Sequence, residues 1–197
     1  MASAKKLWKT LNEGPLGYAF YIFLGIAAAV GFTTLLGIAL NTSVPLVAVL
    51  SGSMDHGLTD EPGPAAYPCA KASVGYVEGF DAWWEKCDYT YDGFSIGREQ
   101  FASFPFRDGF KKGDIPVIMN DGRFSVGDVI VYKIPQQKVP IIHRIVAENG
   151  DGTFQTKGDH NAGQNSYERS VAPEQIHGRV ILIVPYLGYL RVLIPIS

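Results

Sequence analysis

The stretch PIIHRIVAENGDGTFQTKGDHN, residues 140–161, is the part of the sequence that sets the expected fold. Two runs within it, Ile141–Val146 and Gly152–Thr156, are rich in β-branched or aromatic residues and are bounded by Pro, Gly, Asn and Asp, which is typical of short β-strands. Further runs of this character are Val44–Leu50, Asp128–Tyr132 and Val180–Val184. No long amphipathic helix is evident after Asn41, so we expect a mainly β domain, a small β-sandwich or partly closed barrel.

A charge-free apolar segment, Gly17 to Leu40, precedes these strands. With a helical rise of about 1.5 Å per residue, it is long enough to cross the hydrocarbon core of a bilayer. The charged residues before it are three lysines and one acid, Lys5, Lys6, Lys9 and Glu13. Because positive residues favour the cytoplasmic side, we expect the N-terminus in the cytoplasm. The segment is longer than the apolar region of a signal peptide and ends without a small-x-small cleavage pattern, so a retained anchor is expected.

The chain is therefore expected to have three parts. Residues 1–16 form a cytoplasmic tail, 17–40 a transmembrane helix that crosses the cell membrane once, and 41–197 a domain outside it. The apolar residues 180–196 are too short and too interrupted by Pro, Gly and Arg for a second span, which favours a strand followed by a segment at the membrane surface.

An irregular insertion at about 55–124 interrupts the outer domain. It differs from the strands in holding Trp83, Trp84 and several tyrosines. These aromatic residues predict a satellite core, with short helices near Phe80–Glu85 and Ile96–Ser103.

Composition narrows the classes of partner and cofactor. Apolar residues make up 47% of the 197 residues and charged residues 18%, and a soluble domain usually has about a quarter charged. The net charge of −2 gives no electrostatic basis for binding nucleic acid. Cys69 and Cys87 lie near no CxxC pair or close histidine pair, so no metal or other cofactor is expected. A disulfide between them and two separate thiols both stay open.

Three short segments carry side chains capable of chemistry. They are Ser51–Met54, which ends the first predicted strand, the strand containing His143, and the turn at 156–161. Each alone has an ordinary structural explanation. Together they supply a hydroxyl, an imidazole and a carboxylate, the groups needed for a serine nucleophile, its base and an orienting acid.

The same segments resemble those of type I signal peptidases, specifically the archaeal and endoplasmic-reticulum branch. The matching stretches are the N-terminal anchor, SGSM at 51–54, GDVIVY at 127–132, IHRIV at 142–146, TKGD at 156–159, GRV at 178–180 and PYLG at 185–188. They cover the chain except the insertion. Bacterial members have a lysine base where this chain has His143, which indicates the branch.

The resemblance implies a membrane-bound endopeptidase that removes signal peptides from exported pre-proteins. Ser53 would be the nucleophile, His143 the general base and Asp159 the acid that orients it. The oxyanion hole would consist of the backbone N–H of Ser53 and the hydroxyl of Ser51. The implied partners are signal-peptide-bearing pre-proteins, membrane lipid and, as a further candidate, the protein-export channel.

The sequence departs from the family pattern in two places. After Met54 the family usually has an acidic residue and then Pro, whereas here Asp55 is followed by His56-Gly57. The branch often has a second aspartate six positions after the first, and that position is Asn165 here. Three interpretations stay open: Asp159 acts alone, Glu168 substitutes, or the third group is not an acid.

Other assignments compete with this one. His56 and His160 are alternative bases. Lys157 is an alternative lysine base of the kind that bacterial members use, but it lies in the 156–161 segment and not at the position of His143, where the bacterial lysine would be. A non-catalytic single-pass adaptor that binds exported chains would keep the anchor and the β domain without needing Ser53. A self-cleaving enzyme on a similar scaffold is a further alternative, although the anchor and His143 argue against it.

Overall fold

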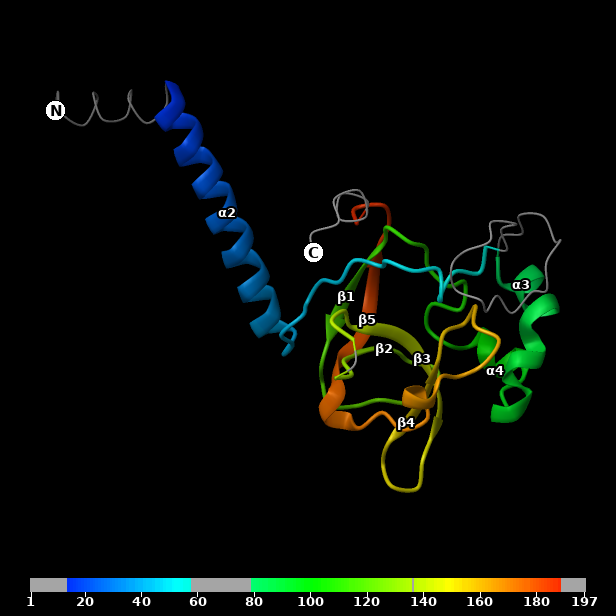
Figure 1. Ribbon diagram of the computed structural model, residues 1–197. Helices are drawn as coiled ribbons and strands as arrows, with labels where there is room; N and C mark the ends of the chain where they lie inside the picture. The colour runs from blue at the N-terminus through cyan, green and yellow to red at the C-terminus, as the bar shows by residue number, and fades with distance from the viewer. Residues whose placement is uncertain (1–13, 58–78, 136, 189–197) are drawn as a thin grey trace. The chain divides into compact units, whose positions relative to one another are not determined.

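The computed structural model describes residues 14–57, 79–135 and 137–188 (Figure 1). It consists of two compact units, Met1–Ala39 and Leu40–Ser197. The predictions about the N-terminal lysines, Cys69 and the residues after 188 fall outside the described residues.

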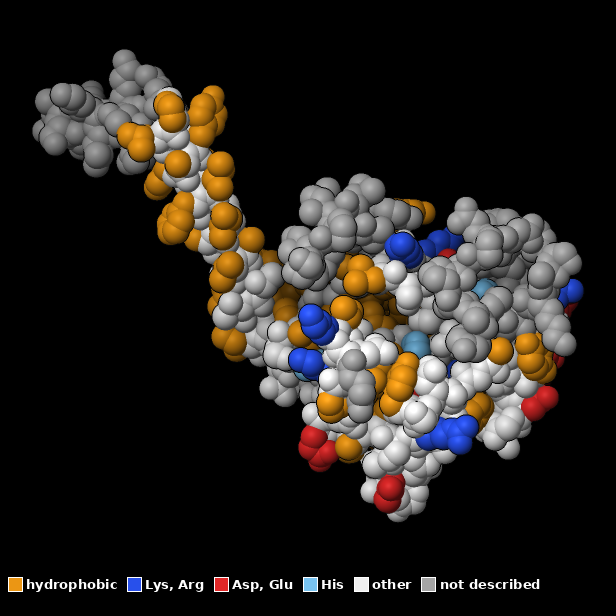
Figure 2. Space-filling model, viewed as in Figure 1, with side chains coloured by type: hydrophobic (Ala, Val, Ile, Leu, Met, Phe, Trp, Pro, Cys, Tyr) orange, Lys and Arg blue, Asp and Glu red, His pale blue; other side chains and the backbone are white. Residues whose placement is uncertain are grey.

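The first unit contains helix α2, Gly14–Ala39. Its 26 residues correspond to a length of about 39 Å at the α-helical rise, more than the hydrocarbon thickness of a bilayer. Its large apolar side chains are more than half exposed at Leu16, Ile22, Phe23, Ile26, Val30, Phe32, Leu35 and Ile38, and they cover the helix along its length (Figure 2). Within the described ranges α2 is the one helix long and apolar enough to cross a membrane.

The second unit is built on one five-stranded antiparallel sheet. Its strands are β1 Ile115–Met119, β2 Val129–Tyr132, β3 Ile141–Glu148, β4 Phe154–Lys157 and β5 Ile176–Val184. Their order is β1-β5-β2-β3-β4, so β5 lies between β1 and β2 although it comes last in the sequence (Figure 1). The mainly β prediction is confirmed, and the sheet does not close into a barrel, because β1 and β4 stay at its edges.

Two segments differ from the sequence prediction. Residues 44–50 run extended but form only one bridge, between Leu46 and Val117, instead of a regular strand. β1 falls inside the range predicted as an insertion, so the inserted part ends before Ile115. Pro116 explains why this strand is hard to recognise: proline cannot donate to a ladder and is confined to edge strands, where β1 indeed lies.

The insertion forms an aromatic cluster of its own. Helix α3 is Phe80–Cys87, the 3₁₀-helix η1 is Asp88–Phe94, and α4 is Arg98–Ala102. Their buried side chains pack on Val146 of β3 and are Phe80, Trp83, Trp84, Cys87, Tyr91, Ile96 and Phe101. Cys87 is fully buried and disulfide-bonded, while Cys69, the chain's other cysteine, is not among the described residues. The cluster fixes the insertion against the sheet beside the predicted site.

Candidate active site

Ser53 lies in a tight turn that is held by its neighbours. The N–H of Asp55 donates to the carbonyl of Gly52 at 3.0 Å, and Met54 is buried in a core cluster with residues such as Val49 and Phe110. The N–H of Phe110 donates to the Met54 carbonyl at 3.0 Å. With Met54 anchored inside, Ser53 is left half-buried, and its Oγ lies 3.2 Å from the Oγ of Ser51.

His143 is held in the middle of β3 by a buried acid. β3 pairs with β2 on one side and β4 on the other, and His143 lies opposite Ile130. Its Nδ1 is hydrogen-bonded to Oε1 of Glu168 at 2.5 Å. Glu168 is fully buried at the end of the 3₁₀-helix η2, Ser166–Glu168.

The other oxygen of Glu168 is also occupied. Its Oε2 accepts hydrogen bonds from the backbone N–H of Asn165 at 2.6 Å and from the Asn165 side chain at 2.8 Å. Burial opposes ionisation, but the bonds and charge from His143 and the bonds from Asn165 outweigh it and lower the pKa of Glu168 below its usual value. An ionised carboxylate only accepts, so Nδ1 of His143 carries the proton and Nε2 is the nitrogen available as a base.

The turn after β4 brings Ser53 and His143 to the same glycine. A Cβ added to Gly158 would lie 2.9 Å from Nε2 of His143 and 2.9 Å from the carbonyl oxygen of Ser53. The N–H of His160 donates to that same carbonyl at 2.9 Å. The available nitrogen of His143 and the backbone of Ser53 therefore meet at a position that only glycine fits.

Asp159 does not contact His143 through any hydrogen bond within the described residues, contrary to the predicted pairing. Its Oδ1 accepts from Arg144 Nε at 2.9 Å and from the Tyr91 hydroxyl at 2.9 Å. Its Oδ2 is bonded to Arg144 Nη2 at 2.7 Å and to His56 Nε2 at 3.0 Å. Burial opposes ionisation, yet the Arg144 charge and the bonds from His56 and Arg144 hold the pKa of Asp159 well below its ordinary value.

The alternation of side chains along a strand explains this difference. His143 and Arg144 are neighbours on β3, so their side chains leave on opposite faces. One face receives Glu168 and the other receives Asp159. The signal that points to Glu168 is Asn165-x-x-Glu168, in which an acid three residues after an Asn binds back to its N–H, as in a capping box.

The competing bases have other partners. Lys157 Nζ is fully buried, donates to the carbonyls of Gly158 at 3.0 Å and Asp159 at 3.4 Å, and burial lowers the pKa of Lys157 to about 7. His56 is hydrogen-bonded to Asp159 and stacks on Trp83. The Nδ1 of His160 is buried without a hydrogen-bond partner in the described part of the chain. Of the histidines 56, 143 and 160, His143 alone has a buried glutamate on Nδ1.

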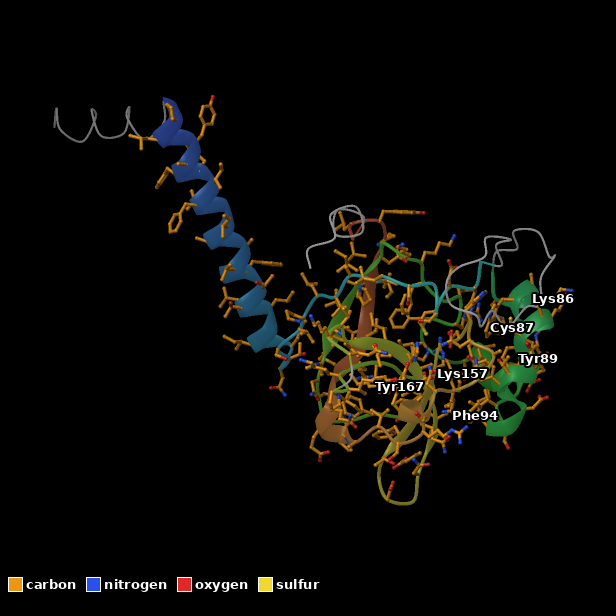
Figure 3. All side chains as sticks on the ribbon, viewed as in Figure 1. Lys86, Cys87, Tyr89, Phe94, Lys157 and Tyr167 are labelled. Carbon is orange, nitrogen blue, oxygen red and sulfur yellow. The ribbon has the colours of Figure 1, made fainter. Side chains whose placement is uncertain are left out.

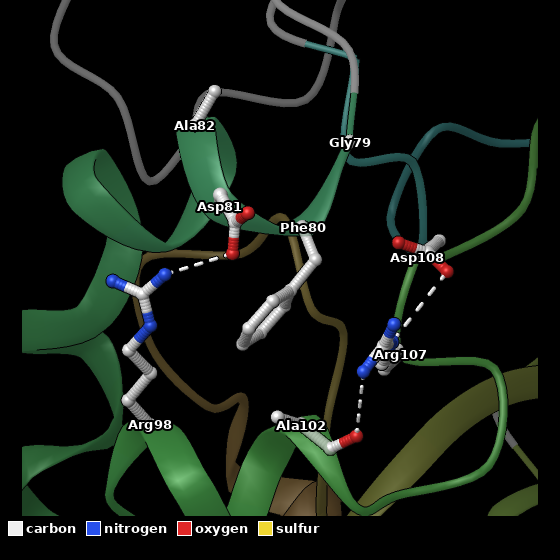
Figure 4. A pocket seen from close by; sticks show the side chains of 8 residues that line it. All are labelled: Gly79, Phe80, Asp81, Ala82, Arg98, Ala102, Arg107 and Asp108. Atoms are coloured by element: carbon white, nitrogen blue, oxygen red, sulfur yellow. Dashed lines mark hydrogen bonds and ion pairs between the residues drawn. The ribbon is translucent and has the colours of Figure 1, made fainter.

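A separate cavity of about 570 Å³ lies on the insertion (Figure 4). Its lining residues are Gly79, Phe80, Asp81, Ala82, Arg98, Ala102, Arg107 and Asp108. Arg98 and Arg107 lie over the Phe80 ring at 5.9 and 6.0 Å, and each forms an ion pair with a neighbouring aspartate. None of the predicted catalytic side chains lines this cavity. In the described residues, no group of three His, Cys, Asp or Glu side chains is arranged to hold a metal ion.

Comparison with known proteins gives the family. No family model matches the chain. A protein of Eremothecium gossypii named signal peptidase complex catalytic subunit SEC11 is 30% identical over 186 residues, which is 88% of this chain and 79% of that protein. Proteins of the same name from Lachancea thermotolerans and Candida tropicalis are 35% and 34% identical over 95 residues each, and these matches span 56% and 57% of their lengths. The chain therefore belongs to the type I signal peptidases, in the branch of the signal peptidase complex catalytic subunits.

Proposed function

We propose that this protein is a membrane-anchored serine endopeptidase that removes signal peptides from pre-proteins, with Ser53 as nucleophile, His143 as general base and Glu168 as the acid that orients the base. The observation that carries the proposal is the pairing at His143. Its Nδ1 is held by a buried carboxylate, and its Nε2 lies against Gly158, as does the Ser53 carbonyl. These contacts supply the acid and the imidazole of such a triad, and they support Ser53, whose carbonyl borders the same glycine, as its nucleophile.

The reaction proceeds in two halves. Nε2 of His143 takes the proton of Ser53 as its Oγ attacks the scissile carbonyl carbon, and Glu168 stabilises the resulting imidazolium. The proton then passes to the leaving amine, and the mature protein departs while the signal peptide stays esterified to Ser53. Water, deprotonated by His143, attacks the ester, releases the signal peptide as a carboxylic acid and restores the serine.

The oxyanion of each tetrahedral intermediate needs donors beside the nucleophile. The backbone N–H of Ser53 is one candidate, and the hydroxyl of Ser51, 3.2 Å from Ser53 Oγ, is the other. One such donor typically lowers the barrier by about 3–4 kcal/mol. Asp159 is assigned no direct role in this scheme, because its oxygens are occupied by Arg144, Tyr91 and His56.

We expect Glu168→Gln to lower kcat by about 10³- to 10⁴-fold with a smaller change in KM, as loss of the orienting carboxylate does in other serine proteases. The amide can present its NH₂ to Nδ1, which then favours the tautomer that no longer leaves Nε2 as the base. The measurement is cleavage of a purified pre-protein by the protein in lipid vesicles. Glu174→Gln, at an exposed position, is the matched control and should retain full activity.

Further variants distinguish an acid supplied by the 165–168 segment from Asp159. Asn165→Asp combined with Glu168→Gln returns a carboxylate to the position where the family usually has one, and partial recovery of kcat would support an acid role in this segment. If Glu168→Gln keeps near-normal kcat while Asp159→Asn is inactive, the assignment passes to Asp159.

The apolar helix α2 supports a proposal about where the reaction takes place. We propose that the chain crosses the cell membrane once with its N-terminus in the cytoplasm, so that the catalytic domain meets pre-proteins as they leave the export channel next to the lipid surface. The support is the charge-free segment 17–40, which forms α2 as far as Ala39, with three lysines before it.

A topology experiment tests this orientation. A tag at the N-terminus should resist protease added outside intact cells, while residues after Leu40 should be cut or reduced to a resistant folded core. A tag digested from outside, with the catalytic domain protected, would reverse the orientation.

A further inference from the structure

Tyr91 in η1 is a fully buried residue of the insertion that reaches the turn beside the catalytic centre. Its hydroxyl donates to Oδ1 of Asp159 at 2.9 Å, across 68 positions of sequence. The face of its ring lies 4.2 Å from the Nζ of Lys157. Tyr91 therefore touches the residues on both sides of Gly158, and Figure 3 shows Lys157 on the flank of the sheet nearer the insertion.

The turn that Tyr91 contacts is fixed from the inside as well. Lys157 Nζ donates to the carbonyls of Gly158 and Asp159, so its own side chain folds back on the turn. The carboxylate of Asp159 is bound by Arg144, next to His143 on β3. Burial and the neighbouring Asp159 raise the pKa of Tyr91, so it stays a phenol and keeps its donor.

Gly158, in the middle of this turn, lies close to both His143 and Ser53. Nε2 of His143 and the carbonyl of Ser53 both lie 2.9 Å from the point that a Cβ of Gly158 would occupy. The space that a side chain at 158 would need is therefore occupied by these two groups and by the Asn161 amide, so all of them lie close to Gly158. A shift of the turn would alter the separation of nucleophile and base.

A second contact from the insertion reaches the nucleophile's own loop. His56, three residues after Ser53, stacks on Trp83 of α3 with 3.8 Å between ring centroids and 5° between planes. Its Nε2 is bonded to the same Asp159 carboxylate. The insertion thus holds the loop that carries Ser53 and the turn that contains Gly158 against one aromatic cluster.

We propose that Tyr91 is a positioning residue for the catalytic centre, through which the insertion fixes the 157–159 turn and hence the separation of Ser53 and His143. This inference rests on the proposed function. It assigns a role to a part of the chain whose sequence predicts only an aromatic core. Tyr91 acts through Gly158 and Asp159 and is not expected to touch the substrate.

Two substitutions divide the contributions of Tyr91. Tyr91→Phe keeps the ring beneath Lys157 and removes the hydroxyl, and it should lower kcat by about 10-fold. Tyr91→Leu removes both contacts and should lower kcat by about 100-fold, the size of effect that a displacement of about 1 Å has on a reacting pair. KM should stay within a factor of two in both. Asp92→Asn, on the same 3₁₀-helix with an exposed side chain, is the control and should leave both constants unchanged.

The test measures the rate per active site, because a merely structural role would instead reduce the fraction of folded molecules. The full-length protein in vesicles is labelled with a fluorophosphonate probe, whose endpoint counts reactive Ser53 and whose rate reports the pairing of Ser53 with His143. We expect a full endpoint with a slower rate for Tyr91→Phe, and a parallel loss of kcat for pre-protein cleavage.

Three results would overturn the proposal: a lower endpoint with an unchanged rate per labelled site, an increased KM with an unchanged kcat, or normal kinetics in both Tyr91 variants. Failure of the proposed function has a different signature, because wild-type protein and Ser53→Ala would then be labelled equally. The two failures are therefore distinguishable in one series of measurements.

Discussion

Ser53→Ala is expected to abolish pre-protein cleavage, with a fall in kcat of about 10⁶-fold, the loss seen when a catalytic serine is removed from other proteases. The substitution deletes the attacking oxygen. It should leave the fold intact, because Ser53 is only half-buried and, among the described residues, its Oγ is hydrogen-bonded to Ser51 alone. The measurement is processing of a pre-protein in vesicles, with thermal unfolding followed in parallel.

Ser51→Ala is the matched control for this experiment. It removes the hydroxyl 3.2 Å away but leaves the nucleophile, so it should reduce kcat by no more than about 10²- to 10³-fold, the range for one oxyanion donor. Unchanged cleavage by Ser53→Ala would exclude the catalytic assignment. A protein that binds pre-proteins without cutting them would then fit the anchor and the sheet better.

His143→Ala is expected to reduce kcat nearly as much as Ser53→Ala, because a serine hydroxyl is a weak nucleophile without a base. The measurement is kcat for one pre-protein, compared between this variant, Ser53→Ala and the unmodified protein.

Lys157→Met distinguishes the histidine base from a lysine base. Lys157 is buried, and its lowered pKa of about 7 would permit base catalysis, but its Nζ donates to the carbonyls of Gly158 and Asp159. We therefore expect a loss much smaller than that of His143→Ala. An inactive Lys157→Met together with an active His143→Ala would instead indicate a mechanism like that of the bacterial enzymes.

Much of the architecture follows from local patterns in the sequence. A charge-free run predicts α2, and runs of β-branched residues predict β2, β3, β4 and β5 to within a few residues. β1 escapes this reasoning because it contains Pro116 and follows an aromatic-rich region. Residues 44–50 have strand composition but run beside β1 with a single bridge, since the pairing partner and not the propensity decides whether a ladder forms.

The sequence indicates which residues belong to the site, but it does not indicate which of them contact one another. The family resemblance singles out Ser53 and His143, and the structure places the Ser53 backbone and the His143 imidazole at Gly158. Which acid faces His143 depends on the side of β3 that each residue occupies, together with the folding back of Glu168 onto Asn165. The contact of Tyr91 with Asp159 joins positions far apart in the sequence, and no local pattern indicates it.

The position of β5 has a consequence for how the domain is made. β5 comes last in sequence among the five strands of this sheet, yet it pairs with β1 on one side and β2 on the other. Until Ile176–Val184 has emerged, β1 has no strand neighbour in the sheet, and β2 has only β3. Pairing of strands so distant in sequence is slow, and unpaired edges favour aggregation. We therefore expect the sheet to be completed only after Ile176–Val184 has been made, so that the earlier strands pass through a stage with unpaired edges.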